Sequence, residues 1–435
     1  MKYTSLPSIT IAGIMIVMTL ISSNLQWGKE NWKGVLESDA KGYYAYLPAV
    51  FIYQDLNFNF FDKIEKEKYY NERLFFEYRA HVNDTTVDKF YCGTAITQLP
   101  FFLMAHTLSG VTSYDQDGYS KFYMIFICLA ALFYLFTGLF FLNKLLILYQ
   151  VSPAARSLTL LTTVFATNVF YYTVVEAGMS HIYSFGCVTM FLYFVKSYFQ
   201  KKQNHQIFIS AILFGIIILL RPVNGLIILT LPFLAGSIKS LQDGMLHLFS
   251  KPKILVFSSI LTLLILSIQP VLYKIAVGSF FVYSYEYEKF NFTDPHFIDI
   301  LFSYKKGLFL YTPVLLLSLT GGIYLFKRSR FEFYSLFLFL IILTYVLSSW
   351  WNWWYGGSFS SRVFMEFIPL FALLLGITLS SLTKGILKSA YITMIFICVV
   401  MCQIQTYQYR YYQIHWENMT KEKYWEVFLR IDKLA

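Results

Sequence analysis

Charged residues are scarce in this sequence. Only 14% of its 435 residues are Asp, Glu, Lys or Arg, whereas 57% are hydrophobic and the mean hydropathy is +0.53. A soluble domain carries about a quarter charged residues. The composition therefore excludes an ordinary soluble domain and indicates a chain whose solvent is largely lipid.

Several informative motifs are also missing. The five cysteines lie mostly in apolar runs and form neither a disulfide framework nor a metal-spaced cluster. The sequence has no phosphate-binding Gly-x-x-x-x-Gly-Lys loop, no dinucleotide-binding glycine pattern, no Gly-x-Ser-x-Gly and no His-Glu-x-x-His. A nucleotide-dependent mechanism therefore has no visible site.

Long apolar runs dominate what is present. A helix needs about 20 apolar residues to cross a bilayer. The first run follows Lys2 without a small-residue cleavage site, so we expect an uncleaved helix and not a signal peptide. The sequence predicts an all-α polytopic membrane protein of about eleven helices, at 8–25, 119–146, 156–175, 178–198, two short helices within 206–236, 254–276, 307–326, 333–350, 363–382 and 389–406.

The orientation follows from basic residues in short loops. With a cytoplasmic N-terminus, the inner segments hold 14 basic residues against two acidic ones, Asp243 and Glu332, which leaves 21 basic and 23 acidic residues elsewhere. The net charge of +10 therefore indicates topology, and nucleic acid is not expected as a partner. We expect an integral protein of a bacterial inner (plasma) membrane with an extracytoplasmic C-terminus.

This orientation places a long first loop, 26–118, outside the membrane, together with 277–306, 351–362 and 407–435. We divide the chain into a transmembrane domain, 1–406, and an extracytoplasmic aromatic tail, 407–435. In the first loop, the aromatic patches Gly42–Tyr53 and Thr94–Val111 are typical of helices on the membrane surface, as is the tail. Asp84 and Asp88, also in this loop, are expected to be solvated charges.

The densest functional pattern opens this loop, as Glu37-Ser38-Asp39 followed by Gly42-Tyr43-Tyr44. A carboxylate near the membrane surface could remove the proton of an acceptor hydroxyl, which contributes about 10²–10⁴ in rate. The structural alternative is that Ser38 or Asp39 caps the following helix. The two roles are compatible.

Arg221-Pro222-Val223-Asn224 interrupts an apolar run. An ionisable residue there indicates a site, because burying it in lipid is costly. Pro222 suits the first position of a helix, which leaves Arg221 at the break, free to bind a phosphate. The alternative is an arginine that extends to the outer interface.

Further cations and aromatics stand at the outer ends of predicted helices. Lys305, Lys306 and Arg362 could hold a phosphate, or anchor the interface, and Arg362 could pair with Glu366 one helical turn on. Trp350-Trp351-Asn352-Trp353-Trp354 suits a membrane aromatic belt or stacking on a sugar ring equally.

Glu176 and His181 lie at another outer turn. They could orient a substrate or bind a divalent ion, and a hydrogen-bonded core histidine is the alternative.

These motifs together resemble the GT-C class of membrane glycosyltransferases, which includes protein O-mannosyltransferases and aminoarabinose transferases, and most closely an uncharacterised bacterial branch. The resemblance covers most of the chain through short motifs. They are Glu37-Ser-Asp39 with Gly42-Tyr43-Tyr44, Gly93–Phe102, Glu176 with Met179-Ser-His181, Arg221-Pro-Val-Asn224, Gly307-Leu-Phe with Thr312-Pro313, and Trp351 to Trp354-Tyr-Gly-Gly with Arg362.

The resemblance implies a polyprenyl-phosphate-linked sugar donor, inverting transfer and a catalytic Asp39 supported by Glu37. The expected phosphate ligands are Arg221, Lys305, Lys306 and Arg362, and the expected substrate contacts are Tyr43, Tyr44, Glu176, His181, Asn224, Trp351 and Trp354. Ser38 separates the two acids, which are adjacent in many family members, so no required metal is expected, although a divalent cation is possible.

The expected function is therefore sugar transfer to a hydroxyl or amine of a glycan, lipid or protein at the extracytoplasmic face, among membrane lipids. The alternatives are a transporter of lipid-linked glycans and a polymerase or ligase of cell-surface polysaccharide. Transporters commonly have paired broken helices, and only one break, at Arg221-Pro222, is visible in the sequence. A polymerase would favour a long outer loop late in the chain.

Overall fold

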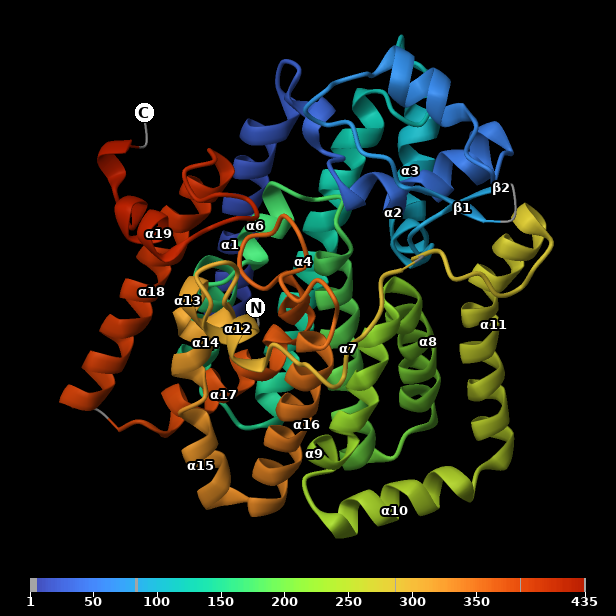
Figure 1. Cartoon of the computed structure of the whole chain (residues 1–435). Coiled ribbons are helices and arrows are strands. Elements are labelled where there is room, and N and C mark those ends of the chain that lie inside the picture. Colours follow the sequence, from blue (N-terminus) through green and yellow to red (C-terminus); the bar gives the residue numbers. More distant parts are fainter. Residues whose placement is uncertain (1–5, 83–84, 286, 384, 434–435) are drawn as a thin grey trace.

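The computed structural model describes residues 6–82, 85–285, 287–383 and 385–433. Within these ranges the chain is a bundle of helices with one two-stranded sheet (Figure 1). Seven described helices are long and apolar enough to cross a membrane: α1 (Leu6–Ser22) with η1 (Ser23–Trp27), α4 (Lys121–Leu148), α7 (Ser180–Lys201), α11 (Pro252–Val277), α16 (Arg330–Ser348), η6 (Arg362–Phe367) with α17 (Ile368–Ser381), and α18 (Ile386–Arg410).

The remaining predicted spans are divided into shorter pieces. Proline opens three of the pieces, at Pro153, Pro222 and Pro313. Pro222 and Pro313 closely follow a helix that they cannot continue, because proline has no N–H. The expected count of eleven full spans is therefore not confirmed. The pieces are α5 (Pro153–Phe165), α6 (Val169–Val174), α8 (Asn204–Leu220), η5 (Pro222–Thr230), α9 (Leu231–Ala235), α13 (Leu308–Tyr311), α14 (Pro313–Ser318) and α15 (Gly321–Arg328).

The chain also turns sharply after α9. The helix α10 (Ile238–Phe249) lies at 118° to the segment Pro222–Ala235, and the two together would make an eighth span if counted as one. Figure 1 shows α10 lying across one end of the bundle.

The turns predicted to be cytoplasmic gather at this same end. Arg328 donates a hydrogen bond to the Tyr149 carbonyl at 3.4 Å, and the Ser152 amide donates one to the Ser380 hydroxyl at 3.0 Å. Lys196 Nζ lies 3.6 Å from the carboxylate of Glu332. The predicted inner turns of six helices (α4, α5, α7, α15, α16 and α17) are thus neighbours at one end of the bundle.

The long first loop folds over the opposite end of the bundle (Figure 1). Its strands pair antiparallel, with Arg79 opposite Asp88. Two expectations for this loop are wrong: α2 is buried along nearly its whole length, not surface-lying, and Asp88 is fully buried, not solvated. Asp84 lies outside the described residues. The elements of the loop are η2 (Asn31–Gly34), α2 (Asp39–Pro48), η3 (Ala49–Tyr53), η4 (Asp62–Lys68), β1 (Arg79–Val82), β2 (Thr85–Asp88) and α3 (Gly93–Gly110).

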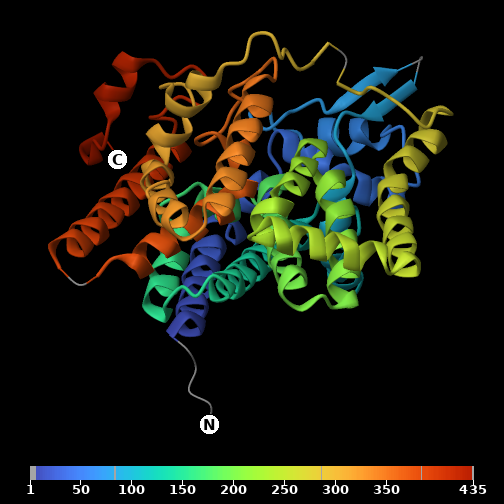
Figure 2. The same ribbon diagram turned by 90° about the horizontal axis from the view of Figure 1, so that it is seen from below.

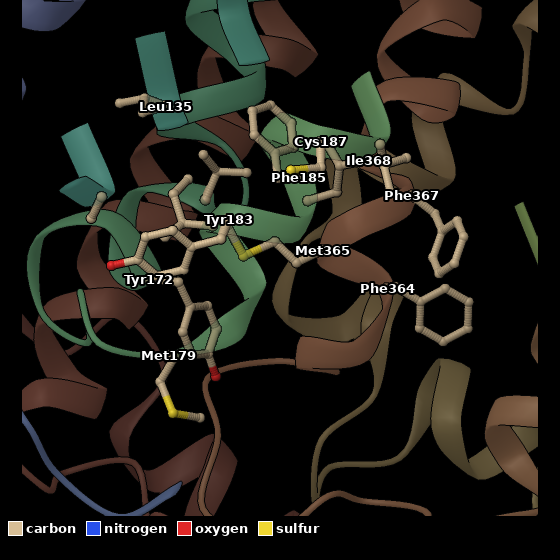
Figure 3. Packing of buried hydrophobic residues seen from close by; sticks show 14 of the residues in the cluster. Leu135, Tyr172, Met179, Tyr183, Phe185, Cys187, Phe364, Met365, Phe367 and Ile368 are labelled. Atoms are coloured by element: carbon tan, nitrogen blue, oxygen red, sulfur yellow. The ribbon is translucent and has the colours of Figure 1, made fainter. Parts of the chain in front are cut away.

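The core is centred on α7, which is buried along most of its length. Figure 3 shows Met365 and Ile368, from η6 and α17, packed beside Tyr183 and Cys187 of α7. By contrast, α18 is mostly exposed and stands at the edge of the bundle in both views (Figures 1 and 2). The helices α7 and η6 with α17 therefore form the buried part of the molecule, and α18 its exposed edge.

The C-terminal segment is not the single surface helix that the sequence predicts. It forms the short helix α19 (Lys421–Val427) and a turn, η7 (Ile431–Lys433). Tyr424 packs edge-on against Tyr311 at 5.6 Å between ring centroids, and the Trp425 indole donates to the Tyr304 hydroxyl at 3.1 Å. These contacts dock the tail on the segment that joins α12 (Phe297–Phe302) to α13.

Candidate active site

A cavity of about 430 Å³ opens beneath the outer loops. Its volume lies within the range of about 300–1,000 Å³ that is usual for small-molecule sites. Half of its lining residues are aromatic, and three cationic and two anionic side chains reach it. The lining residues include Asp39, Tyr43, Lys89, Phe90, Arg221, Tyr285, Glu288, Trp351, Tyr355 and Arg362.

Asp39 and Arg362 meet in this cavity although 323 positions separate them. Arg362 Nη2 donates to Asp39 Oδ2 at 2.7 Å, and the two side chains are only 11% and 20% exposed. The pair joins the first residue of α2 to the first residue of η6. The alternative in which Arg362 pairs with Glu366 is therefore wrong.

The backbone before Asp39 is held in an unusual conformation. Ser38 has φ +51° and ψ −132°, a combination that favours glycine. Its side chain makes no capping hydrogen bond, so the alternative in which Ser38 caps α2 is wrong. Asp39 instead occupies the first turn of the helix, where the positive end of the helix dipole favours a carboxylate.

Arg221 lies at the break between α8 and η5, as predicted from Arg221-Pro222. Its guanidinium contacts two fully buried groups: Nε is 3.7 Å from Glu366 Oε1, and Nη1 is 3.3 Å from His181 Nε2. His181 Nδ1 lies 3.0 Å from the same Glu366 oxygen. Arg221 is therefore fixed from behind while it lines the cavity.

Glu366 is a site residue that the sequence interpretation missed as such. Its spacing of one helical turn from Arg362 predicts only a partner for that residue. The available signal was its position, a carboxylate inside an apolar run, which is costly without a partner.

Gly93 locks the first loop to the end of α8. A β-carbon at this position would lie 2.3 Å from the backbone of Leu219 and Leu220. The start of α3 therefore touches the backbone directly before Arg221, which no larger residue would allow without displacement.

The two lysines predicted as phosphate ligands do not line the cavity. Lys306 is buried, and its ammonium donates to the carbonyls of Ser358 and Trp416. The ammonium of Lys305 lies 3.2 Å from the centre of the Trp354 ring. Burial lowers the pKa of Lys306 to about 7, since the charged form loses its hydration.

The aromatic residues predicted as substrate contacts also divide into two groups. Tyr43 and Trp351 line the cavity, and Trp351 is 40% exposed. Tyr44 is fully buried and donates to the Gly118 carbonyl, and the Trp354 indole donates to Glu417 at 3.1 Å. Tyr44 and Trp354 therefore hold neighbouring segments and do not reach the cavity.

Glu37, Glu176 and Asn224 lie near the site without lining it. Glu176 accepts a hydrogen bond from Tyr171 at 3.0 Å, and burial raises its pKa to about 7. Burial also raises the pKa of Glu37, against the opposing effect of the nearby cations Arg73 and Lys41. The Asn224 amide donates to Ser184 at 3.2 Å.

The segment between α11 and α12 roofs the cavity. Lys89 Nζ lies 2.6 Å from Glu288 Oε1, which ties this roof to the first loop. The Trp351 amide donates to the Lys289 carbonyl at 3.0 Å, and Phe290 forms an isolated β-bridge with Trp350. The roof is thus attached on two sides.

The possible divalent-cation site finds no counterpart in the part of the chain that the structure describes: no three His, Cys, Asp or Glu side chains there are grouped so that they could hold a metal ion. The predicted pair Glu176 and His181 is not joined, because His181 is bound to Glu366.

The fold and the cavity define a helical protein with membrane-length apolar helices and a charged, aromatic site at one end of the bundle. No family model and no curated protein matches the sequence. Among solved structures, the chain is similar to the apo form of the Archaeoglobus fulgidus oligosaccharyltransferase, with 13% sequence identity and a TM-score of 0.47 over 97% of this chain. The match spans 60% of the length of that enzyme.

Proposed function

We propose that the protein is an inverting glycosyltransferase that uses a polyprenyl-phosphate-linked sugar at the extracytoplasmic face of a bacterial plasma membrane. The single observation that supports this is the meeting of Asp39, Arg221 and Arg362, distant in sequence, in one aromatic-walled cavity. A carboxylate and two guanidinium groups are what base-assisted displacement of a phosphate requires. The acceptor would be a hydroxyl or amine of a glycan, lipid or protein.

The ion pair of Asp39 with Arg362 requires that the donor binds before Asp39 removes a proton from the acceptor. While Arg362 donates to Asp39 Oδ2, that oxygen is occupied by the guanidinium and is not free to take a proton from the acceptor. A donor phosphate would compete for Arg362, with Arg221 as its second ligand, and so release Asp39. Donor binding would thereby switch on the base.

The chemical step then balances within the cavity. Asp39 takes the proton of the acceptor, and the acceptor oxygen or nitrogen forms a bond to the anomeric carbon from the face opposite the phosphate. The bond from that carbon to the phosphate oxygen breaks, and the polyprenyl phosphate leaves with the electron pair. Arg221 and Arg362 stabilise the charge that develops on it. Lys305 and Lys306 have no part in this step, because they do not reach the cavity.

The Asp39→Asn variant tests the proposal. Purified protein in lipid nanodiscs would be given synthetic polyprenyl-phosphate mannose, glucose and aminoarabinose, with total cell-envelope lipids and glycans as acceptors. For the donor that is used, we expect the variant to lose about 10²–10⁴ in rate with donor binding retained.

Asp299→Asn is the matched control, because Asp299, in α12, is an exposed carboxylate paired with His296 and does not line the cavity. Thermal melting would check that Asp39→Asn still folds without the partner of Arg362. Full transfer by folded Asp39→Asn would overturn the base assignment. Donor binding without turnover of any donor by the wild type would favour the transporter alternative.

A further inference from the structure

A second, smaller cavity lies on the other side of α2. It has a volume of about 160 Å³ and is lined by residues of the first loop, among them Trp32, Lys41, Glu65, Tyr69 and Tyr70. Asp39 and Tyr43, four residues apart, both line the larger cavity, whereas Lys41 lies between them in sequence and lines the smaller one. On a helix, residues two apart face nearly opposite directions. The helix α2 is therefore the wall between two cavities.

The floor of the smaller cavity is an ion pair. Lys41 Nζ lies 2.8 Å from Glu65 Oε2, and the side chains are only 12% and 3% exposed. A buried ion pair adds little net stability, because desolvation of the two charges offsets their attraction. An ammonium has three donors, and a carboxylate accepts several hydrogen bonds, so the pair keeps hydrogen-bonding capacity beyond their mutual contact.

The cationic side chains around this cavity are paired with carboxylates. Each of its lysines has a carboxylate partner: Lys33 with Glu30 at 2.5 Å, Lys41 with Glu65, and Lys68 with Asp115 and Asp117 at 2.6 and 2.7 Å. Three cations thus stand against four anions. A phosphate group would find no net positive charge here, whereas an uncharged ligand with many hydroxyls would find both donors and acceptors.

The aromatic rings complete a pattern suited to sugars. Trp32 and Tyr69 meet edge to face, with ring centroids 6.1 Å apart, and Tyr70 is 56% exposed. Aromatic rings pack against the C–H faces of a sugar while polar groups bind its hydroxyls. Asn71, which also lines the cavity, adds an amide.

We propose that this cavity is a carbohydrate subsite, which binds one uncharged sugar ring of the acceptor while the acceptor's reactive end lies at Asp39. That the bound ring belongs to the acceptor rests on the proposed function. That the cavity binds a sugar ring is independent of it. Leu36 lines the smaller cavity and Asp39, three residues further on, lines the larger one, so the two cavities approach each other at the start of α2. The acceptor would therefore be a glycan and not a simple lipid alcohol.

Binding without any donor tests the subsite. Saturation-transfer NMR on the purified full chain would use the methyl glycosides of mannose, glucose, galactose and N-acetylglucosamine, with inorganic phosphate as competitor. We expect at least one glycoside to bind saturably and phosphate to leave that binding unchanged. The Tyr70→Ala and Trp32→Ala variants should each weaken it about tenfold.

Tyr114→Ala is the matched control, since Tyr114 is an exposed tyrosine of the same loop, outside the cavity. It should bind glycosides as the wild type does. No saturable binding, equal loss in Tyr114→Ala, or displacement by phosphate would overturn the subsite. Because Asp39 is unchanged in all these variants, loss of the subsite with Asp39-dependent transfer intact would leave the proposed function standing.

Discussion

At the scale of single residues, the conformation of Ser38 is the least expected feature. A non-glycine residue at φ +51° and ψ −132° costs on the order of 1–3 kcal/mol and persists only where the surroundings enforce it. Here the surroundings are the ion pair that Asp39 makes with Arg362. The strain is consistent with selection for the position of the carboxylate over local stability.

Glu366 is predicted to act mainly through Arg221. Glu366→Gln removes a fully buried carboxylate and leaves the guanidinium without its charge partner, so we expect a loss of about 3 kcal/mol in the free energy of unfolding. Arg221→Met should cost a similar amount, and the double variant should cost less than the sum by about 1–3 kcal/mol. Unfolding in mixed detergent micelles measures these free energies. If the losses of the two single variants added up in the double variant, Glu366 and Arg221 would not be energetically coupled.

The stability of the protein should depend on the protonation of Glu176. Burial raises its pKa from 4.5 to about 7, so the folded chain holds a proton that the unfolded chain releases. Its contribution to stability is fully present below pH 4.5 and is lost as the pH rises towards 7. Melting temperatures between these pH values should fall less steeply for Glu176→Gln than for the wild type. The same slope in both proteins would show that the stability does not depend on this proton.

At the scale of elements, the sequence predicts which segments are helical but not where those helices are interrupted. The apolar runs at 119–146, 254–276 and 389–406 each correspond to one long helix, because they contain no competing signal at their centres. The run at 307–326 does not, since Pro313 and the glycines Gly321 and Gly322 let tertiary packing divide it. Hydropathy averages over such breaks.

The roof over the cavity should open when its attachment to the first loop is removed. Lys89→Glu places two carboxylates together at a half-buried contact worth about 1 kcal/mol, so amide hydrogens of 287–291 should exchange about fivefold faster. The double variant Lys89→Glu with Glu288→Lys should restore slow exchange. Lys289→Glu, at the adjacent exposed lysine, is the control. Slow exchange in Lys89→Glu would mean that the backbone bonds hold the roof alone.

At the scale of the whole molecule, the sequence predicts which helix turns lie at the same end of the bundle. It does not predict which residues line the cavity. The excess of basic residues assigns the inner turns correctly to one end, because that signal is summed over many residues. Pairing of Asp39 with Arg362 depends on how α2 and η6 pack, across 323 positions, and no local pattern encodes it. For the same reason Lys305 and Lys306 could not be separated from the cavity residues.

The orientation in the membrane can be tested by thiol labelling. The five natural cysteines are all buried, so background reaction should be low. A membrane-impermeant maleimide should label Tyr287→Cys in intact cells, because Tyr287 is 73% exposed in the predicted outer loop. It should label Gln242→Cys, in α10, only after the membrane is permeabilised. The reverse pattern would place the cavity in the cytosol and remove the basis for a polyprenyl-borne donor.

The contact of Gly93 with the end of α8 has a mechanical consequence. With no side chain between the two backbones, the first loop cannot tilt without carrying Leu219 and Leu220 with it. The carboxylate on α2 and the guanidinium that follows α8 therefore belong to one stiff unit. Under the proposed function, entry of a long-chain lipid would therefore involve the roof or mostly exposed helices such as α18, and not a separation of the first loop from the end of α8.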